Sequence, residues 1–293
     1  MRIIVPYTPG GTTDIAARLV AEPLVKILGQ PVIVENRPGA NSIVGVAAAA
    51  TSPADGYTLV MVLPAHAANV TLQAGKLPFD AIAGFAPVSL VVSAPLVLAG
   101  SRRIPGQTLR DFLDYARKNP GRMNYGSSGI GATAHLAMEL LKLRTGVQME
   151  HIPYRGTQPA LQDLMAGNIG LLFDTYSTLK PRSEAGNIRP LGIAARERAA
   201  FAPDLPTIIE VGLPDFAASS WCMLLAPAGT PTDITARLSA EVARIVRDPL
   251  MTTKLQDLGF VVEGRSPAEA ARFLQAEVDR WGEVIRAAKV TVE

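Results

Sequence analysis

The clearest chemical signal in the chain lies in residues 125–135, which read YGSSGIGATAH. Residues 123–125 predict a short strand before it, and Leu136, Leu140 and Leu141 recur at helical spacing after it. Such a turn directs several backbone N–H groups at one point, where the helix macrodipole adds partial positive charge. An anion can bind there without a lysine or arginine. An ordinary βα turn whose serines only cap the helix fits the same residues, and both interpretations stay open here.

A second turn of this kind follows the strand-like residues 3–5. Residues 6–14 read PYTPGGTTD, and apolar residues then recur at helical spacing until Gly29. Pro23 falls inside that pattern and is expected to kink the helix or fix its first part. The turn resembles a phosphate loop only superficially, because the Gly-Lys-Ser/Thr ending is missing.

A hydrolase is the main enzymatic alternative, because residues 125–129 approach the G-x-S-x-G motif with Tyr125 at the first glycine. That fold needs the chain order Ser, acid, His. All three histidines precede Asp163 and Asp174, and Glu150 is directly beside His151. We therefore expect no catalytic residues and no enzyme activity.

The composition excludes several other classes. The chain has 293 residues, 48% of them hydrophobic, which is enough for one large domain or two ordinary ones. A net charge of +2 with scattered Lys and Arg gives no electrostatic footprint for nucleic acid. The single cysteine, Cys222, allows no internal disulfide and no Cys-based metal site, and we expect it to be a buried small hydrophobe. No metal or cofactor is predicted.

Strand and helix patterns alternate along most of the chain. Three βα units in the first 75 residues predict a parallel sheet covered on both faces, with ligands at the carboxyl ends of its strands. Residues 103–219 form a separate run of βα units. The uncharged stretches 56–75 and 81–101 contain Pro64, Gly84, Pro87 and Pro95, so we expect strands and turns rather than membrane spans. Capping-box patterns predict helix starts at residues 108–111 and 266–269.

The ordered set of motifs resembles the extracytoplasmic solute receptors of tripartite tricarboxylate transporters, the Bug-type family. The matching pieces run from end to end, and each is weak alone. They are residues 4–14 (IVPYTPGGTTD), 29–40 (GQPVIVENRPGA), 53–59 (PADGYTL), 85–90 (FAPVSL), 125–136, 151–156 (HIPYRG), 173–174 (FD), 204–207 (DLPT), 212–214 (GLP) and 225–231 (LAPAGTP).

This resemblance implies an α/β, two-lobed periplasmic-binding-protein fold (type 2, Venus-flytrap), with each lobe a mostly parallel sheet covered by helices. Lobe one would comprise residues 1–102 and 220–293, and lobe two residues 103–219. The lobes would close by hinge motion on a small carboxylate, either a di- or tricarboxylate or an aromatic acid. The protein would be a periplasmic monomer, exported by a leader absent from this sequence, that serves a membrane permease. A sensory receptor for a signalling kinase is the alternative.

The resemblance also implies the ligand-binding residues. Lobe one would contribute two loops and lobe two an anion loop with two neighbouring segments. These residues are Tyr7, Pro9, Gly10, Gly11, Thr12, Leu63, Pro64, Ala65 and His66 in lobe one, and Ser127, Ser128, Gly129, Gly131, Ala132, Thr133, His135, Tyr154, Arg155, Gly156, Asp174 and Thr175 in lobe two. The sequence departs from the family pattern at Thr8, Ala132 and Val70. The first two lie in ligand loops, which leaves the identity of the ligand open.

Five polar residues have competing explanations. His135 is placed either to touch the ligand or to satisfy a loop carbonyl. His66 is the weaker candidate, and His151, within a strand, is expected to be structural. Arg155 would pair with a carboxylate or lie solvated in its loop. Asp174 would accept a hydrogen bond from a ligand hydroxyl, amine or water, or cap the helix that follows.

Overall fold

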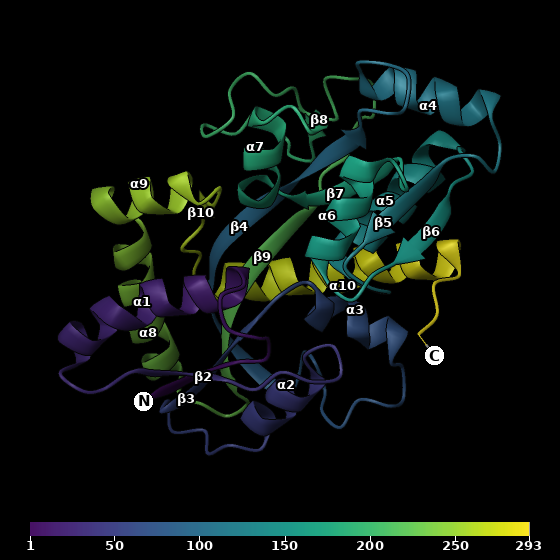
Figure 1. The fold of residues 1–293 in the computed structure, drawn as a ribbon. Coiled ribbons are helices and arrows are strands. Elements are labelled where there is room, and N and C mark those ends of the chain that lie inside the picture. Colours follow the sequence, from purple (N-terminus) through teal and green to yellow (C-terminus); the bar gives the residue numbers. More distant parts are fainter. Residues whose placement is uncertain (293) are drawn as a thin grey trace. The chain divides into compact units, whose positions relative to one another are not determined.

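In the computed structural model, residues 1–292 are described, and they group into two compact units (Figure 1). Unit one comprises Met1–Ser93, Trp221–Gln256 and Phe260–Gly282. Unit two comprises Ala94–Ser220, Asp257–Gly259 and the described residues from Glu283 onward. The grouping places residues 94–102 with unit two. The two units group residues that lie near one another, and they do not show which residues move together. The lobe boundaries expected at 102 and 220 therefore stay a prediction.

The strands of unit one form a mixed sheet. Strand β1 (Arg2–Val5) pairs in parallel with β2 (Ile33–Asn36) on one side and β3 (Thr58–Val62) on the other, as the three βα units predict. Strand β9 (Ser219–Pro227) pairs antiparallel with β3. The short β10 (Val261–Val262) pairs antiparallel with the first part of β4 (Phe85–Ser101). The parallel β1–β3 core places the loops after β1 and β3 at the same sheet edge.

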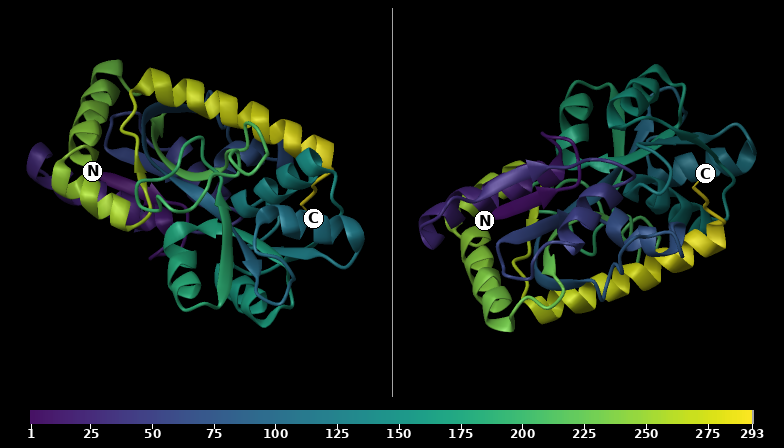
Figure 2. Two further views of the ribbon diagram at one scale, coloured as in Figure 1. Left: turned by 90° about the horizontal axis from the view of Figure 1, so that it is seen from above. Right: turned by 90° about the horizontal axis from the view of Figure 1, so that it is seen from below.

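Six helices belong wholly or mainly to unit one: α1 (Thr12–Leu28), α2 (Ile43–Ala50), α3 (Ala65–Leu72), α8 (Thr232–Val246), α9 (Pro249–Asp257) and α10 (Pro267–Ala288). Helix α1 stays continuous through Pro23 and packs against α8. Figure 2 shows α10 as one unbroken helix in both views. The core joins apolar residues of β1, β3 and β9 to Leu274 and Val278 of α10. Burial of this apolar surface is what fixes the helices on the sheet.

Unit two repeats the strand and helix alternation expected for residues 103–219. Strand β5 (Asn124–Ser127) lies between β6 (Glu150–Pro153) and β7 (Leu171–Thr175) and is parallel to both. Strands β7 and β8 (Ile188–Ile193) pair antiparallel with the last part of β4. The helices are α4 (Leu109–Lys118), α5 (Thr133–Thr145), α6 (Thr157–Ala166) and α7 (Tyr176–Glu184). The carboxyl ends of β5, β6 and β7 therefore carry the predicted lobe-two segments.

Residues 81–101 form fewer turns than their sequence indicates. Only the first few residues turn, and β4 then continues unbroken over 17 residues with Pro87 and Pro95 inside it. Proline removes a ladder donor, so it is tolerated only where no partner requires its N–H group. Here the register between β4 and β7 begins at Leu96, after the second proline.

Both predicted capping boxes form. The Thr108 hydroxyl accepts from the N–H of Asp111, and the Asp111 carboxylate accepts from the N–H of Thr108. At the start of α10, the Glu269 carboxylate accepts from Ser266 N–H at 3.0 Å, and the Ser266 hydroxyl accepts from Glu269 N–H at 3.4 Å. Each box satisfies two N–H groups that a helix start leaves unpaired.

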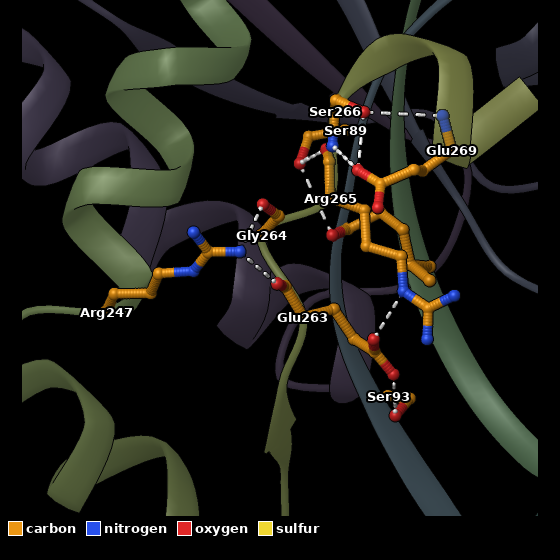
Figure 3. A network of polar contacts seen from close by, with 9 residues as sticks. Ser89, Ser93, Arg247, Glu263, Gly264, Arg265, Ser266 and Glu269 are labelled. Atoms are coloured by element: carbon orange, nitrogen blue, oxygen red, sulfur yellow. Dashed lines mark hydrogen bonds and ion pairs between the residues drawn. The ribbon is translucent and has the colours of Figure 1, made fainter.

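The segment before α10 is held on β4 by a polar network (Figure 3). The Ser93 hydroxyl donates to Glu263 at 2.8 Å, and the Ser89 hydroxyl donates to the backbone oxygen of Arg265 at 2.8 Å. The Arg265 guanidinium pairs with Glu263 at 2.7 Å. Arg247 donates to the backbone oxygens of Glu263 and Gly264. These contacts fix the direction in which the chain enters α10.

Cys222 is fully buried in β9, and burial raises the pKa of its thiol to about 12, so it is the inert hydrophobe that we expected. Among residues 1–292, no helix is long and apolar enough to cross a membrane. The same residues contain no group of three or more His, Cys, Asp or Glu placed to hold a metal ion.

Candidate functional site

The loop after β1 is the first predicted ligand segment of unit one. Pro9, Gly10 and Gly11 are exposed, and Thr12 begins α1. Gly10 has a φ of +83°, which a side chain would strain. The residue before the helix, Gly11, makes no side-chain cap, so the first N–H groups of α1 have no capping acceptor from it. The loop can therefore present backbone donors to an anion.

Asp14, in the first turn of α1, fixes this loop. Its carboxylate accepts from the N–H of Gly10 at 2.9 Å and from the guanidinium of Arg18 at 2.9 and 3.0 Å. Asn36, at the end of β2, donates to Asp14 at 2.9 Å and to the backbone oxygen of Tyr7 at 3.1 Å. The hydrogen bond from Arg18 is the main reason that the pKa of Asp14 falls to about 2. Neither Asp14 nor Asn36 was predicted to shape this loop, although an acid at the third helical position is a known signal.

Tyr7 is half-buried, and its fully buried hydroxyl faces the hydroxyl of Ser42 and the backbone of Leu63. Neither the Tyr7 nor the Ser42 hydroxyl forms a hydrogen bond of standard geometry with another described residue. Burial raises the pKa of Tyr7 above its usual range, so the phenol stays neutral. Residues 40–42 before α2 all have positive φ, a conformation that non-glycine residues rarely adopt. The segment before α2, whose Ser42 faces Tyr7, is thus held in an unusual shape.

The loop after β3 contains the second predicted segment of unit one, Leu63 to His66. Pro64 precedes α3, and Ala65 and His66 form its first turn. The His66 ring is buried against Phe79 and Phe85, and its Nε2 lies 2.8 Å from the backbone oxygen of Ala81. Burial lowers the pKa of His66 to about 4. The imidazole is therefore buried and bonded within unit one, which agrees with its being the weaker candidate for ligand binding.

The predicted anion loop of unit two connects β5 to α5. Ala132 precedes the helix and offers no side-chain cap to its first N–H groups. Ser128 and Thr133 are half-buried, and their hydroxyls form no hydrogen bond within the described part of the chain. Gly129 and Gly131 both have positive φ. The loop thus offers two uncommitted hydroxyls beside a helix N-terminus that the Ala132 side chain does not cap.

Ser127 is different, because its hydroxyl is fully buried and already bonded. It donates to the backbone oxygen of Gly129 at 3.0 Å and lies 2.7 Å from Nε2 of His151. Nearby, Gly131 N–H donates to Nδ1 of His135 at 3.0 Å. His135 therefore satisfies a loop N–H rather than the loop carbonyl considered from sequence. The structure brings His151 to the loop as well, which its position within a strand did not indicate.

The other two lobe-two segments adjoin this loop. Tyr154 N–H donates to the backbone oxygen of Ser127 at 3.0 Å, and Gly156 N–H donates to that of Ser128 at 3.3 Å. The Tyr154 hydroxyl donates to Asp163 at 2.5 Å, and burial raises its pKa to about 12. Arg155 is exposed. The backbone of residues 154–156 is thus joined to the anion loop.

Asp174 and Thr175 end β7 beside the same segments. The Asp174 carboxylate accepts from the Thr157 hydroxyl at 2.8 Å and from Thr175 N–H at 2.7 Å. Burial raises the pKa of Asp174 despite these bonds. Asp174 therefore links β7 to the start of α6. It does not cap α7 by a side-chain bond, since that cap position is Thr175 and has none.

The chain order required for a hydrolase does occur, because Glu139 lies between Ser127 and His151, contrary to the order we inferred from sequence. The three groups are nevertheless not arranged as a triad. Ser127 is fully buried, and Glu139 accepts from Lys142 at 2.7 Å and from the Tyr125 hydroxyl rather than from His151. A buried serine without an oriented base cannot attack a substrate.

Comparisons with known proteins agree with this architecture. The family model described as "Tripartite tricarboxylate transporter family receptor" matches residues 16–290. A Pseudomonas sp. (strain P51) protein, described as a UPF0065 protein in the tcbD-tcbE intergenic region, is 33% identical over 96% of this chain and 84% of its own length. The BugT protein of Bordetella pertussis is 33% identical over 98% of this chain and 88% of its own length.

Solved structures show the same similarity. A Rhodopseudomonas palustris protein solved with adipate has a TM-score of 0.88 and 36% identity, covering 99% of this chain and 97% of its own. MatC of Rhodopseudomonas palustris, solved with malate, has a TM-score of 0.82 and 34% identity, covering 97% and 98%. The periplasmic binding protein BugD has a TM-score of 0.83 and 28% identity.

The fold is therefore that of the periplasmic solute-binding proteins, as the sequence predicted. Within that class, the chain belongs to the tripartite tricarboxylate transporter receptor family, the Bug-type proteins. Membership supports a solute-binding role. The individual ligand-binding residues stay predictions, with the geometry described above.

Proposed function

We propose that this protein captures a small carboxylate, either a di- or tricarboxylate or an aromatic acid, between two lobes that close on it by hinge motion. The observation that carries the proposal is the anion loop of unit two. It has a helix start without a side-chain cap. The hydroxyls of Ser128 and Thr133 beside it form no hydrogen bond with another described residue. Relatives of the same fold were solved with adipate and with malate.

Hydrogen bonds, rather than a side-chain cation, would recognise the carboxylate. The loop from Ser127 to Thr133 contains no lysine or arginine. A carboxylate accepting from hydroxyls and from helix N–H groups forms charge-assisted bonds, which are shorter and stronger than neutral ones. The exposed glycines after β1 offer a second set of backbone donors in unit one. A ligand with two acidic or polar ends would use both sets.

In the cell, we propose that the protein works in the periplasm and delivers its ligand to the membrane subunits of a tripartite tricarboxylate-type transporter. Family membership supports this partner. Genes for such subunits beside the gene for this protein would strengthen the assignment, whereas a neighbouring sensor kinase would favour a sensory role.

A thermal-shift screen tests the proposal directly. The panel contains mono-, di- and tricarboxylates and aromatic acids, with adipate and malate included and neutral amides of the same acids as controls. A ligand that binds only the folded state stabilises it by about 2.7 kcal/mol at a hundredfold excess over Kd. We expect at least one acid to raise the melting temperature in proportion to the logarithm of its concentration, while its amide has no effect. An unchanged melting temperature across the panel would contradict the proposal.

A further inference from the structure

Two histidines stack directly beneath the anion loop. The rings of His135 (α5) and His151 (β6) lie 3.9 Å apart between centroids, with an interplanar angle of 10°. The ring of Tyr125 (β5) stacks on His151 at 4.9 Å. Three elements thus contribute one ring each to a single stack. The stack alone would be consistent with ordinary core packing.

The polar edge of His135 faces the loop. Its Nδ1 accepts the N–H of Gly131 at 3.0 Å, so Nδ1 carries no proton and the hydrogen of the neutral ring lies on Nε2. That Nε2 lies 3.9 Å from a carboxylate oxygen of Glu139. Glu139 in turn accepts from Lys142 at 2.7 Å and from the Tyr125 hydroxyl. The hydrogen bond from Gly131 therefore orients the ring, because 3.9 Å is too long for a hydrogen bond to Glu139.

The polar edge of His151 faces the same loop through Ser127. Because the Ser127 hydroxyl donates to the backbone oxygen of Gly129, the remaining contact, at 2.7 Å, is a donation from Nε2–H of His151. Gly129 N–H also donates to the Ser127 hydroxyl, at 3.2 Å. His151 thus stabilises a small ring of hydrogen bonds that gives the first half of the loop its shape.

Both histidines are neutral near pH 7. Burial lowers the pKa of His135 to about 3, and the neighbouring His151 and Lys142 act in the same direction. Burial also lowers the pKa of His151 to about 4, although Glu139 opposes this shift. A neutral ring is what the His135 contact requires, since an imidazolium at position 135 would present a proton to the N–H of Gly131.

We propose that His135 and His151 are positioning residues of the anion loop, which they hold in its binding shape before the ligand arrives. His135 fixes Gly131, and His151 fixes Ser127 and Gly129. The hydroxyls of Ser128 and Thr133 are then left free for the carboxylate. This inference rests on the proposed function, because it assigns the loop to ligand binding. A loop ordered in advance loses less conformational entropy on binding, which raises affinity without a direct contact.

Paired substitutions separate positioning from packing. In His135→Asn, the amide oxygen can replace Nδ1 as the acceptor for Gly131, whereas His135→Phe keeps an aromatic ring without an acceptor. In His151→Gln, the amide nitrogen can replace Nε2 as the donor to Ser127, whereas His151→Phe cannot donate. The Phe variants keep the stacked core filled, and near-ultraviolet circular dichroism checks that each variant is folded.

The first measurement needs no ligand. Amide hydrogen exchange of residues 127–131 is followed in the parent and in the four variants. We expect both Phe variants to exchange faster at the loop, with the Asn and Gln variants closer to the parent. In addition, the ¹⁵N shifts of His135 should show a neutral ring protonated at Nε2. Loop exchange that is the same in all five proteins would overturn the inference.

The second measurement is calorimetry with adipate and malate, and with the strongest acid from the thermal-shift screen. Loss of one neutral hydrogen bond corresponds to about threefold to tenfold weaker binding. We expect that loss in each Phe variant and recovery of most of the affinity in the Asn or Gln variant. Phe variants that bind like the parent would make the histidines core residues only. A parent that binds no acid would instead contradict the proposed function, while the exchange measurement still decides whether the histidines hold the loop.

Discussion

Neighbouring serines in the anion loop have different environments. From sequence, Ser127 and Ser128 are equivalent hydroxyls in one glycine-rich turn. In the structure, Ser127 is fully buried and bonded to Gly129 and His151, whereas Ser128 is half-buried and has no bonded partner among the described residues. The difference arises because Ser127 is the last residue of β5, where its side chain points into the unit. Only Ser128 is therefore available to a ligand.

This difference predicts different effects of two similar substitutions on stability. Ser128→Ala should weaken carboxylate binding roughly tenfold to a hundredfold, because a hydrogen bond to a charged group contributes about 1.5–3 kcal/mol. Its melting temperature without ligand should not change. Ser127→Ala should lower the melting temperature, because it removes the hydroxyl oxygen that accepts from Gly129 N–H and from Nε2–H of His151. Calorimetry and thermal unfolding on both variants, with Thr133→Ala as a third, measure the two effects. Parent-like binding by Ser128→Ala and Thr133→Ala together would place the carboxylate elsewhere.

At the residue scale, the sequence identified the loop but not what supports it. Glycines and hydroxyls between a strand and a helix are a local pattern, and local patterns are readable. The contact between His151 and Ser127 depends on the parallel register that places β6 beside β5, with Ser127 opposite Pro153. The bonds between Asn36 and the loop after β1 depend in the same way on the pairing of β2 with β1. Neither register can be derived from one sequence.

At the scale of elements, the predictions succeeded where a cap or a periodic pattern set the boundary. Helix α4 starts after Thr108 and α10 after Ser266, as their capping residues indicate. Helix α1 ends at Leu28, directly before Gly29, which adopts the left-handed conformation. The predictions failed in β4, where Pro87 and Pro95 suggested turns. A proline breaks a strand only if the neighbouring strand needs an N–H donor at that position. Whether it does depends on which strand lies beside it, and that is a tertiary feature.

The attachment of α10 depends on one buried carboxylate. The indole N–H groups of Trp221, in β9, and Trp281, in α10, both donate to Glu277, at 2.7 and 2.9 Å. Both indoles are fully buried, and Glu277 is almost so. The helix is thus bound to the sheet by a shared acceptor in addition to its apolar face.

Removing that acceptor should destabilise the protein strongly. Glu277→Leu leaves two buried indole donors unpaired, and each unpaired group costs about 1–3 kcal/mol. Glu277→Gln keeps one oxygen acceptor and should lose less. Urea unfolding followed by tryptophan fluorescence reports on both indoles. Glu283→Leu, an exposed position of the same helix, is the matched control and should change the free energy of unfolding by no more than about 0.5 kcal/mol. Equal stability of Glu277→Leu and the control would show that the indoles find other partners.

For the molecule as a whole, the end-to-end order of motifs was sufficient to predict the fold class, because each motif marks a turn between a strand and a helix. It was not sufficient to predict how the last residues group. Residues 257–259 and 283–292 belong with unit two, although the sequence around them is continuous with unit one. Gly259, for example, lies against Tyr176 of α7. Such a contact between residues more than eighty positions apart leaves no local signal.

All three histidines of the chain share one electrostatic property, which predicts the response of the molecule to acid. Burial lowers the pKa of His66 to about 4, of His135 to about 3 and of His151 to about 4. In the unfolded chain each has a pKa of about 6.5. Between pH 6.5 and pH 4 the unfolded state therefore binds more protons than the folded state. The three histidines therefore lower the stability as the pH decreases through that window, whereas Asp174, whose pKa burial raises, acts in the opposite direction.

The expected loss is on the order of 1–2 kcal/mol for each histidine at pH 5. Asp14 adds nothing there, because its folded-state pKa of about 2 affects stability only below its unfolded value of about 3.8. Urea unfolding at pH 7.5, 6.0 and 5.0 measures the loss in the parent. In His66→Gln, whose amide can still donate to the backbone oxygen of Ala81, the pH dependence should be weaker by one proton whatever its stability at pH 7.5. A parent equally stable at pH 7.5 and pH 5.0 would mean that the folded protein keeps its imidazoles accessible to protons.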